Sequence, residues 1–376
     1  MRLVCVCRGM PGLGRVTPAV GLVNTLTRRG EIEVVFASYA AGVRYLQRLG
    51  MTVEDLDMPA GLFIDSVAPQ ALQVLGLVER YQPDAVLVDG EPFLPVTLAD
   101  VGVPVVYLAN PYDLLPDTTT FQRVNRRLLT FADAVIVSSV GCPRPRPHQR
   151  VIVGTPCLEV PAIVKEFPLP HQRSPRPRVL VTSGGGSVGA DPAFRAATDD
   201  AIEQTLQELR PLVGAGQISA VTLVLGVDAA SPALCGEPWL RVIAEATELT
   251  DLYAHHEVLV ARAGRNVAAE ALYCGIPTVL LPIDSDRHRA AEQSANAAIA
   301  AKAPHIQSLP DWRRPGSISA AVRTALSSAT RHARRRGECG NQAAIGFLDQ
   351  IIAAAHQRNI ALLLAAPIPK RAQAHG

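Results

Sequence analysis

The stretch EVLVARAGRNVAAEALYCGIPTVLLP, residues 257–282, contains a strand, a helix and a second strand in close succession. The apolar run 258–261 predicts a buried strand, and Gly264 breaks this pattern before a short helix over 265–274. A glycine and a proline end the helix, and 278–281 predicts the next strand. This βαβ unit has a tight glycine turn at the carboxyl end of its first strand, which is where α/β sheets bind ligands.

The helix that follows Gly264 has the features of a phosphate site. Its amino terminus offers unpaired N–H groups and the positive end of the helix dipole. Asn266 and Glu270 are four residues apart, so they share one helix face, about 6 Å apart. A diphosphate on the turn would leave the Glu270 carboxylate one turn further in, where it could accept two hydrogen bonds from a ribose diol. The alternative is that Asn266 caps the helix and Glu270 complements its dipole.

Composition favours a globular protein of more than one domain. At 376 residues the chain is too long for one ordinary core, and its formal charge of +2 is not the basic field of a nucleic-acid binder. Residues 1–12 are broken too soon by glycine and proline to be a signal peptide, and the longest apolar run, 360–366, is far shorter than the roughly 20 residues of a membrane span. Seven cysteines without a CxxC pattern, with Cys5 and Cys7 alternating along a strand, favour a reducing cytoplasm and argue against structural zinc. We expect a cytoplasmic protein with no metal ion and no cofactor.

Predicted strands alternate with helices in both halves of the chain, as in parallel sheets covered on both faces. The strands are predicted at 3–7, 33–37, 53–56, 85–88, 103–108, 134–137 and 151–153, and again at 179–182, 221–225, 258–261 and 278–281; helices include 18–29 and 67–81. The proline- and arginine-rich stretch 168–178 predicts the linker. We therefore expect an α/β chain of two Rossmann-like domains, 1–165 and 166–345, whose parallel sheets face a central cleft. Residues 346–376 would form a C-terminal helix and tail, and the apolar segment 343–366 is expected to pack on the first domain.

Three glycine loops follow predicted strands, at 9–18, at 183–191 and at Gly264. Each loop alone is a weak signal because tight turns need glycine. Three of them at the same kind of position predict a ligand cleft between the domains.

The second domain resembles the donor half of GT-B glycosyltransferases. Three motifs carry this resemblance: GGSVGA at 185–190, ARAGRNVAAEALYCGIP at 261–277, and Gln293 followed by Asn296 and Ala297. In pattern it is most similar to the family 28 enzymes that add N-acetylglucosamine to the peptidoglycan lipid intermediate, and to their natural-product relatives. The first domain matches more weakly, through GLGRVTPAVGLVNTLTRRG at 12–30.

The resemblance implies a nucleotide-sugar site with roles for individual residues. Glu270 would hold the ribose hydroxyls, the Gly264 turn would hold the diphosphate, and the second glycine loop would contact the phosphates or shape the pocket. Glu292 and Gln293 would hold sugar hydroxyls, or form an ordinary polar helix face. Arg262 would pair with a phosphate or with a neighbouring carboxylate. The full set of donor-binding candidates is Gly14, Gly185, Gly186, Ser187, Arg262, Gly264, Asn266, Glu270, Glu292 and Gln293.

The chief departure from the family is Arg15, which stands where many members have a histidine. An arginine stays protonated and cannot act as a general base near neutral pH, but it could stabilise charge on the leaving diphosphate. Asp89 and Glu91 follow a predicted strand and are candidates for the base, as is Asp113. Each could equally be a loop residue, a cap or an ion-pair partner. A chain without a base would have a changed activity.

The resemblance therefore implies an inverting, hexosyltransferase-type enzyme of cell-wall or natural-product biosynthesis. It would transfer sugar from a nucleotide-diphosphate donor, most simply a UDP-sugar, to the hydroxyl of a lipid-linked or small-molecule acceptor. A nucleotide-sugar hydrolase or epimerase, and a non-catalytic nucleotide-binding subunit, remain alternatives. No nucleic-acid partner is expected. The basic, apolar segment 121–132 would contact the inner face of a membrane or bind a phosphorylated lipid, or would be an ordinary amphipathic helix.

Overall fold

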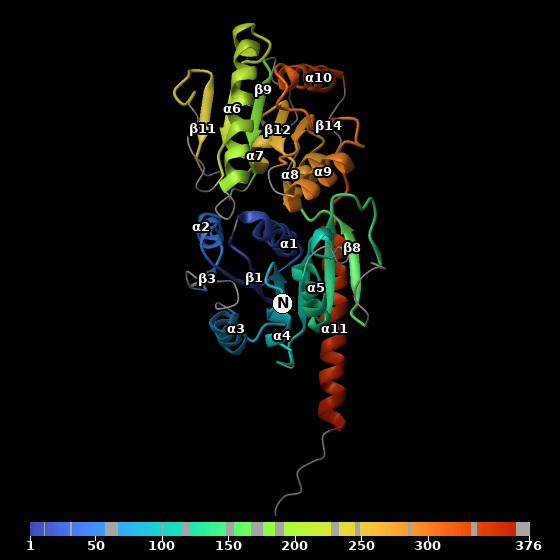
Figure 1. Cartoon of the computed structure of the whole chain (residues 1–376). Helices are drawn as coiled ribbons and strands as arrows, with labels where there is room; N and C mark the ends of the chain where they lie inside the picture. The colour runs from blue at the N-terminus through green and yellow to red at the C-terminus, as the bar shows by residue number, and fades with distance from the viewer. Residues whose placement is uncertain are drawn as a thin grey trace, which may run out of the picture.

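The structure is a computed structural model of the chain. It describes all residues except 11, 31, 57–66, 100, 115–119, 148–153, 167–175, 185–191, 227–232, 245–248, 285–286, 332–336 and 366–376. The described residues form two α/β domains, one above the other in Figure 1. The predicted linker 168–178 and the predicted strand 151–153 fall largely or wholly outside the described residues.

The first domain is built on a sheet of eight strands in the order β3-β2-β1-β4-β5-β6-β8-β7. All neighbouring pairs are parallel except β7 with β8. The order 3-2-1-4-5-6 is that of a Rossmann sheet. Its strands are β1 Arg2–Cys7, β2 Glu33–Ser38, β3 Val53–Asp55, β4 Ala85–Asp89, β5 Val105–Ala109, β6 Ala134–Ser139, β7 Arg146–Pro147 and β8 Cys157–Pro161.

The second domain repeats this order in a six-stranded parallel sheet, β11-β10-β9-β12-β13-β14. Counted from its own first strand, the order is again 3-2-1-4-5-6. Its strands are β9 Arg178–Thr182, β10 Ala220–Val224, β11 Leu240–Ile243, β12 Val258–Arg262, β13 Thr278–Leu281 and β14 Ile306–Ser308. The expectation of two Rossmann-like parallel sheets is confirmed.

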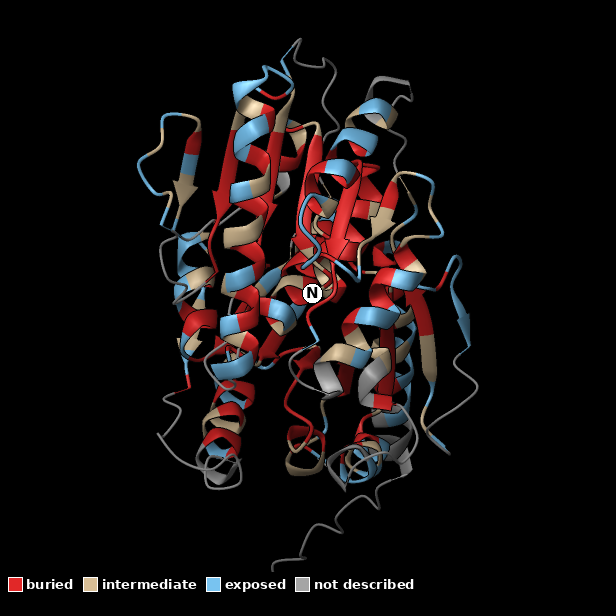
Figure 2. Cartoon of the chain, turned by 45° about the horizontal axis from the view of Figure 1, so that its top comes forward, coloured by how far each residue is buried: buried red, intermediate tan, exposed pale blue. Residues whose placement is uncertain are grey.

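Helices cover both faces of the sheets, and the strands between them are the most buried part of the chain (Figure 2). The helices are α1 Val16–Arg29, α2 Ala41–Arg48, α3 Val67–Tyr81, α4 Leu94–Thr97, α5 Thr120–Leu128, α6 Pro192–Gly214, α7 Leu249–Ala254, α8 Arg265–Cys274, α9 Arg287–Ala300, α10 Ser317–Arg331 and α11 Asn341–Ala365, with short 3-10 turns η1 Leu13–Arg15, η2 Pro111–Leu114 and η3 Leu129–Phe131. Cys5 and Cys7 are core residues, as predicted, and all seven cysteines are free thiols. Within the described residues, no helix has both the length and the apolarity to cross a membrane.

The helix α11 follows the second domain in sequence but packs on the first, beside α1 and β8 (Figure 1). Ala344, Ile345 and Leu348 belong to the core of the first sheet, as expected for this segment. Asn341 is the first residue of this helix, and its side chain is fully buried and hydrogen-bonded to the first domain. Its Nδ2 donates to the Val164 carbonyl at 2.7 Å and to Thr25 Oγ1 at 2.7 Å. A buried amide with its hydrogen bonds satisfied specifies one docking position for the helix.

Candidate active site

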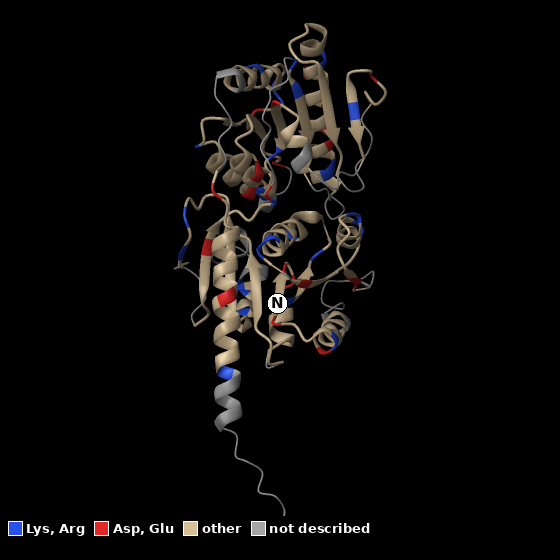
Figure 3. Cartoon of the chain, turned by 180° about the vertical axis from the view of Figure 1, so that it is seen from behind, with Lys and Arg blue, Asp and Glu red and all other residues tan. Residues whose placement is uncertain are grey.

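The described candidate residues, apart from Glu292 and Gln293 on α9, end or follow strands that flank the two points where strand order reverses. In the first sheet this point lies between β1 and β4, and in the second it lies between β9 and β12. Crevices at such points are the usual ligand sites of open α/β sheets. Figure 3 shows acidic and basic residues interspersed over both domains. Because neither charge dominates a whole domain, the electrostatics of the site depend on the individual charged pairs in it.

The helix α8 begins at the expected place, with Gly264 as its N-cap and no side chain capping it. Asn266 lies inside the helix, and its Nδ2 donates to Thr17 Oγ1 at 2.7 Å and to the Gly14 carbonyl at 3.2 Å. The alternative that Asn266 caps its own helix is therefore wrong. The residue instead joins the second domain to the glycine loop of the first.

Arg265 makes a second contact of this kind, which the sequence did not single out. Its guanidinium donates to the Gly14 carbonyl at 3.1 Å and to the Ser138 carbonyl at 3.4 Å. One feature of the sequence could have indicated this contact: Arg265 follows Gly264 directly. A long cationic side chain on the first turn of a helix can reach a neighbouring domain. Arg265 and Asn266 together hold the loop that carries Arg15 against the first turn of α8.

Glu270 lies on α8, one turn beyond Asn266, and is 7% exposed. Its Oε2 accepts a hydrogen bond of 2.6 Å from the hydroxyl of Tyr253, which comes from α7. Burial, together with the negative charge of Glu270, raises the pKa of Tyr253 well above its ordinary value. The raised pKa keeps the phenol protonated near neutral pH, where it donates to the carboxylate.

Arg15 pairs with Asp89 at the end of β4. Nη1 of Arg15 lies 3.3 Å from Oδ1 of Asp89, and the carboxylate is 1% exposed. Gly90 follows with φ +89°, and a Cβ there would lie 2.8 Å from Cβ of Arg8 and 2.9 Å from Cγ of Arg15. Only glycine allows the two arginines to pass so close to the backbone at this turn.

Glu91 is the second carboxylate of this cluster and is also buried. Its Oε1 accepts a hydrogen bond of 2.6 Å from Tyr39 and lies 3.6 Å from Nε of Arg8. Burial raises the pKa of Glu91, although Arg8 and the Tyr39 hydrogen bond act in the opposite direction. Asp113, the third base candidate of the sequence, has a side chain outside the described residues.

The raised pKa of Glu91 predicts a specific pH dependence. A carboxyl whose pKa is higher in the folded chain binds its proton more tightly there. Its contribution to stability is complete below its unfolded pKa of about 4.3, and it is lost as the pH rises through the folded pKa. In urea unfolding between pH 4 and pH 8, the native chain should therefore lose stability relative to Glu91→Gln as the pH increases. Glu33→Gln, at an exposed position of β2, is the control. A constant difference between native chain and Glu91→Gln would contradict the shift.

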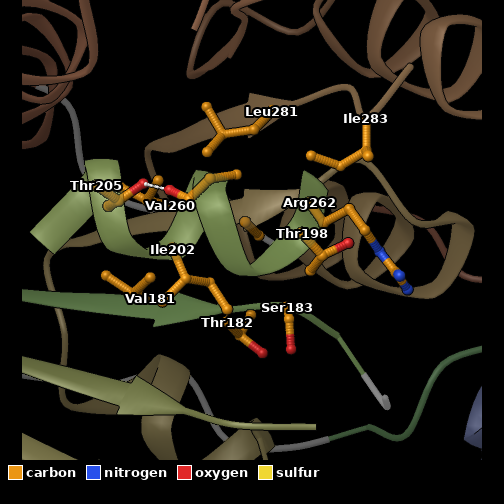
Figure 4. Close-up of a pocket in the computed structure, with 12 residues that line it drawn as sticks. Val181, Thr182, Ser183, Thr198, Ile202, Thr205, Val260, Arg262, Leu281 and Ile283 are labelled. Atoms are coloured by element: carbon orange, nitrogen blue, oxygen red, sulfur yellow. Dashed lines mark hydrogen bonds between the residues drawn. The ribbon is translucent and has the colours of Figure 1, made fainter. Parts of the chain in front are cut away.

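Arg262 lies beside both glycine turns of the second domain. A Cβ on Gly184 would be 3.4 Å from its Nη2, and a Cβ on Gly264 would be 3.9 Å from the same atom. Its Cζ lies 5.1 Å from the centroid of the Phe194 ring. Figure 4 shows the side chain at one end of a small cavity that Thr198 and Ser183 also line. The other candidates of this loop, Gly185, Gly186 and Ser187, lie outside the described residues.

The two candidates on α9 have different surroundings. Oε1 of Glu292 accepts a hydrogen bond of 3.1 Å from the Asn110 amide, which follows β5 of the first domain. Oε1 of Gln293 accepts from the backbone N–H of Ile283 at 3.1 Å, so this side chain ties α9 to the end of β13. Glu292 thus reaches across the domain junction, whereas Gln293 is bound within its own domain.

Residues 178–345 match the family model "Glycosyltransferase family 28 C-terminal domain". Two curated relatives are UDP-N-acetylglucosamine–N-acetylmuramyl-(pentapeptide) pyrophosphoryl-undecaprenol N-acetylglucosamine transferases. The protein from Prochlorococcus marinus is 30% identical over 48% of this chain, and the match spans about half of that relative, 46% of its length. The protein from Halorhodospira halophila is 28% identical, with coverage of 79% of this chain and 81% of the relative.

Two solved structures show the same fold. MurG of Acinetobacter baumannii superposes with a TM-score of 0.54 at 14% identity, over 93% of this chain and 100% of that one. The spinosyn rhamnosyltransferase SpnG in complex with thymidine diphosphate gives a TM-score of 0.55 at 17% identity, over 94% of this chain and 96% of that one. The expectation of a GT-B architecture is confirmed.

Proposed function

We propose that the chain transfers a sugar from a nucleotide diphosphate to an acceptor hydroxyl, because residues 178–345 match the model of the glycosyltransferase family 28 C-terminal domain and the chain has a GT-B fold. The observation that supports this proposal most directly is that the glycine loop of the first domain is hydrogen-bonded to the first turn of α8. A diphosphate at this turn would meet the helix dipole, Arg262 and the loop that carries Arg15. We propose a UDP-sugar as donor, which is the donor named for the curated relatives.

The donor would lie along α8 and toward α9. Glu270 would accept hydrogen bonds from the ribose hydroxyls, and Glu292 would accept from the hydroxyls of the sugar. Gln293, Gly14, Gly185, Gly186 and Ser187 stay in the proposed site as residues that shape it. None of these assignments needs a metal ion or a cofactor, because cationic side chains and backbone N–H groups would receive the leaving charge.

In the proposed reaction, the acceptor oxygen attacks the anomeric carbon from the face opposite the diphosphate. The new C–O bond forms as the bond to the phosphate oxygen breaks, with inversion at the carbon. The proton of the acceptor hydroxyl passes to a carboxylate of the first domain. We favour Glu91 over Asp89 as this base, because burial raises the pKa of Glu91 toward the working pH, whereas Asp89 is held by Arg15.

We propose the class of acceptor from the side chains that α5 and η3 expose at the surface. Val124 and Phe131 are 43% and 50% exposed, and Arg123 and Arg127 are exposed on the same segment. Apolar and basic side chains together suit the headgroup region of an anionic membrane. We therefore propose a lipid-linked acceptor, with the protein at the inner face of a membrane, and a small-molecule acceptor as the alternative.

The test is a thermal-shift and calorimetric screen of UDP, GDP and TDP, followed by assay of UDP-sugars with lipid-linked acceptors. We expect UDP to stabilise the native chain most and a UDP-sugar to turn over only with acceptor. Release of free sugar without acceptor would identify a hydrolase, and isomerised donor would identify an epimerase. Tight UDP binding without turnover over many donor–acceptor pairs would identify a non-catalytic subunit, the alternative that Arg15 favours. Failure of all three nucleotides to bind would overturn the proposal.

A further inference from the structure

Tyr253 is a buried polar residue that has no role in the proposed reaction. Its ring is fully buried in the core cluster that lies between the second sheet and α8. The phenol oxygen lies 2.6 Å from Oε2 of Glu270, a short hydrogen bond of the kind that an ionised acceptor makes. The backbone of α7 and the packed ring thus fix the position of one oxygen of the carboxylate.

This contact determines what the carboxylate can bind. A glutamate side chain has three rotatable bonds, and a ligand that has to order them loses affinity to the cost in conformational entropy. Here the phenol orders the carboxylate before any ligand arrives, because it holds Oε2 in one position. Because Tyr253 remains a donor, the pair can offer only acceptor oxygens to a ligand, which suits hydroxyl groups.

We propose that Tyr253 is a positioning residue that orients the Glu270 carboxylate toward a ribose diol and so sets a preference for ribonucleoside over 2′-deoxyribonucleoside diphosphates. This inference rests on the proposed function, because it requires a nucleotide along α8. It goes beyond that function because it assigns the choice between ribose and 2′-deoxyribose to Tyr253, a residue that does not touch the ligand.

The experiment measures the affinities of UDP and 2′-deoxy-UDP by calorimetry on the full chain and on Tyr253→Phe. For the native chain we expect UDP to bind about tenfold more tightly, since a hydroxyl that hydrogen-bonds to a charged group is recognised strongly. In Tyr253→Phe the ratio should fall to about threefold or less, because a carboxylate that is not held in place reads the 2′-hydroxyl less strongly. Tyr273→Phe is the matched control, because Tyr273 is a buried tyrosine of α8 in the same core cluster. It should leave the ratio unchanged.

A merely structural role for Tyr253 would weaken both nucleotides by one factor and leave their ratio at the native value, which would overturn the inference. Should Tyr253→Phe not fold, the comparison moves to Glu270→Ala with and without Tyr253→Phe, where no carboxylate is left to position and the double variant leaves no phenol without its acceptor. Equal ratios in these two variants are expected, because the phenol acts through the carboxylate. Different ratios would show that Tyr253 acts elsewhere and would overturn the inference.

The native chain itself separates this inference from the proposed function. If UDP and 2′-deoxy-UDP bind equally well, the proposed function stands and the positioning role is wrong. If neither nucleotide binds, both are wrong.

Discussion

Glu270→Gln should weaken UDP binding by about a hundredfold, which corresponds to about 3 kcal/mol. In the proposed site the carboxylate accepts two hydrogen bonds from the ribose, and hydrogen bonds to a charged acceptor contribute about 1.5–3 kcal/mol each. Glutamine has the same shape and still offers Tyr253 an acceptor oxygen, so the fold is retained. Alanine is a poorer choice because it would leave the buried phenol without this acceptor.

The measurement is calorimetric titration with UDP, supported by the thermal shift at saturating nucleotide. Glu292→Gln is the matched control, because it makes the same change of charge on α9, at a side chain bonded to Asn110 of the first domain. It should leave UDP binding within about twofold, since a group that contacts only the sugar does not contribute to the affinity for UDP. Equal stabilisation of native chain and Glu270→Gln by UDP would show that the carboxylate does not read the ribose.

Arg15→Met should lower the rate of sugar transfer by about a hundredfold to a thousandfold while UDP still binds. The expected loss reflects removal of a cation that the hydrogen bonds of Arg265 and Asn266 hold beside α8. The substitution also leaves Asp89 buried without the guanidinium, which costs stability. The double variant Arg15→Met with Asp89→Asn removes that charge and separates stability from catalysis.

Single-turnover assays with a UDP-sugar and calorimetry with UDP distinguish the possible roles of Arg15. Restoring the histidine of the family, in Arg15→His, should leave donor binding intact. Complete loss of binding in Arg15→His would instead mean that Arg15 contacts the diphosphate in the ground state. Unchanged transfer in Arg15→Met would remove this residue from the proposed mechanism.

The helix and strand after Gly264 could be predicted to the residue, and the strand before it to within one residue, because apolar runs, glycine and proline mark their limits. The structure places α8 at Arg265–Cys274 and β13 at Thr278–Leu281, which are the predicted limits. The strands β7, β8, β11 and β14 were not predicted. None of them is buried along its whole length, so their residues lack the continuous apolar run of a central strand.

The contacts of the site are less accessible to sequence reasoning than its backbone. The positions of Asp89 and Glu91 after a strand predicted where they lie, but the arginines beside them depend on how the β1 loop folds back over Gly90. Ser138 is 127 positions from Arg265. Tyr253 and Glu270 come from consecutive helices separated by a strand, and no periodic pattern relates their side chains. Such pairs are fixed by tertiary packing, which local sequence patterns do not contain.

The docking of α11 on the first domain has a consequence for how the chain is made. The first sheet ends with Pro161, but α11 is synthesised only after the whole second sheet. Until then the nascent first domain leaves the ribosome with one flank of its core open, at the place that Ala344 and Leu348 later cover. We expect a chain stopped after residue 340 to bind chaperones and aggregate, although both sheets would be complete.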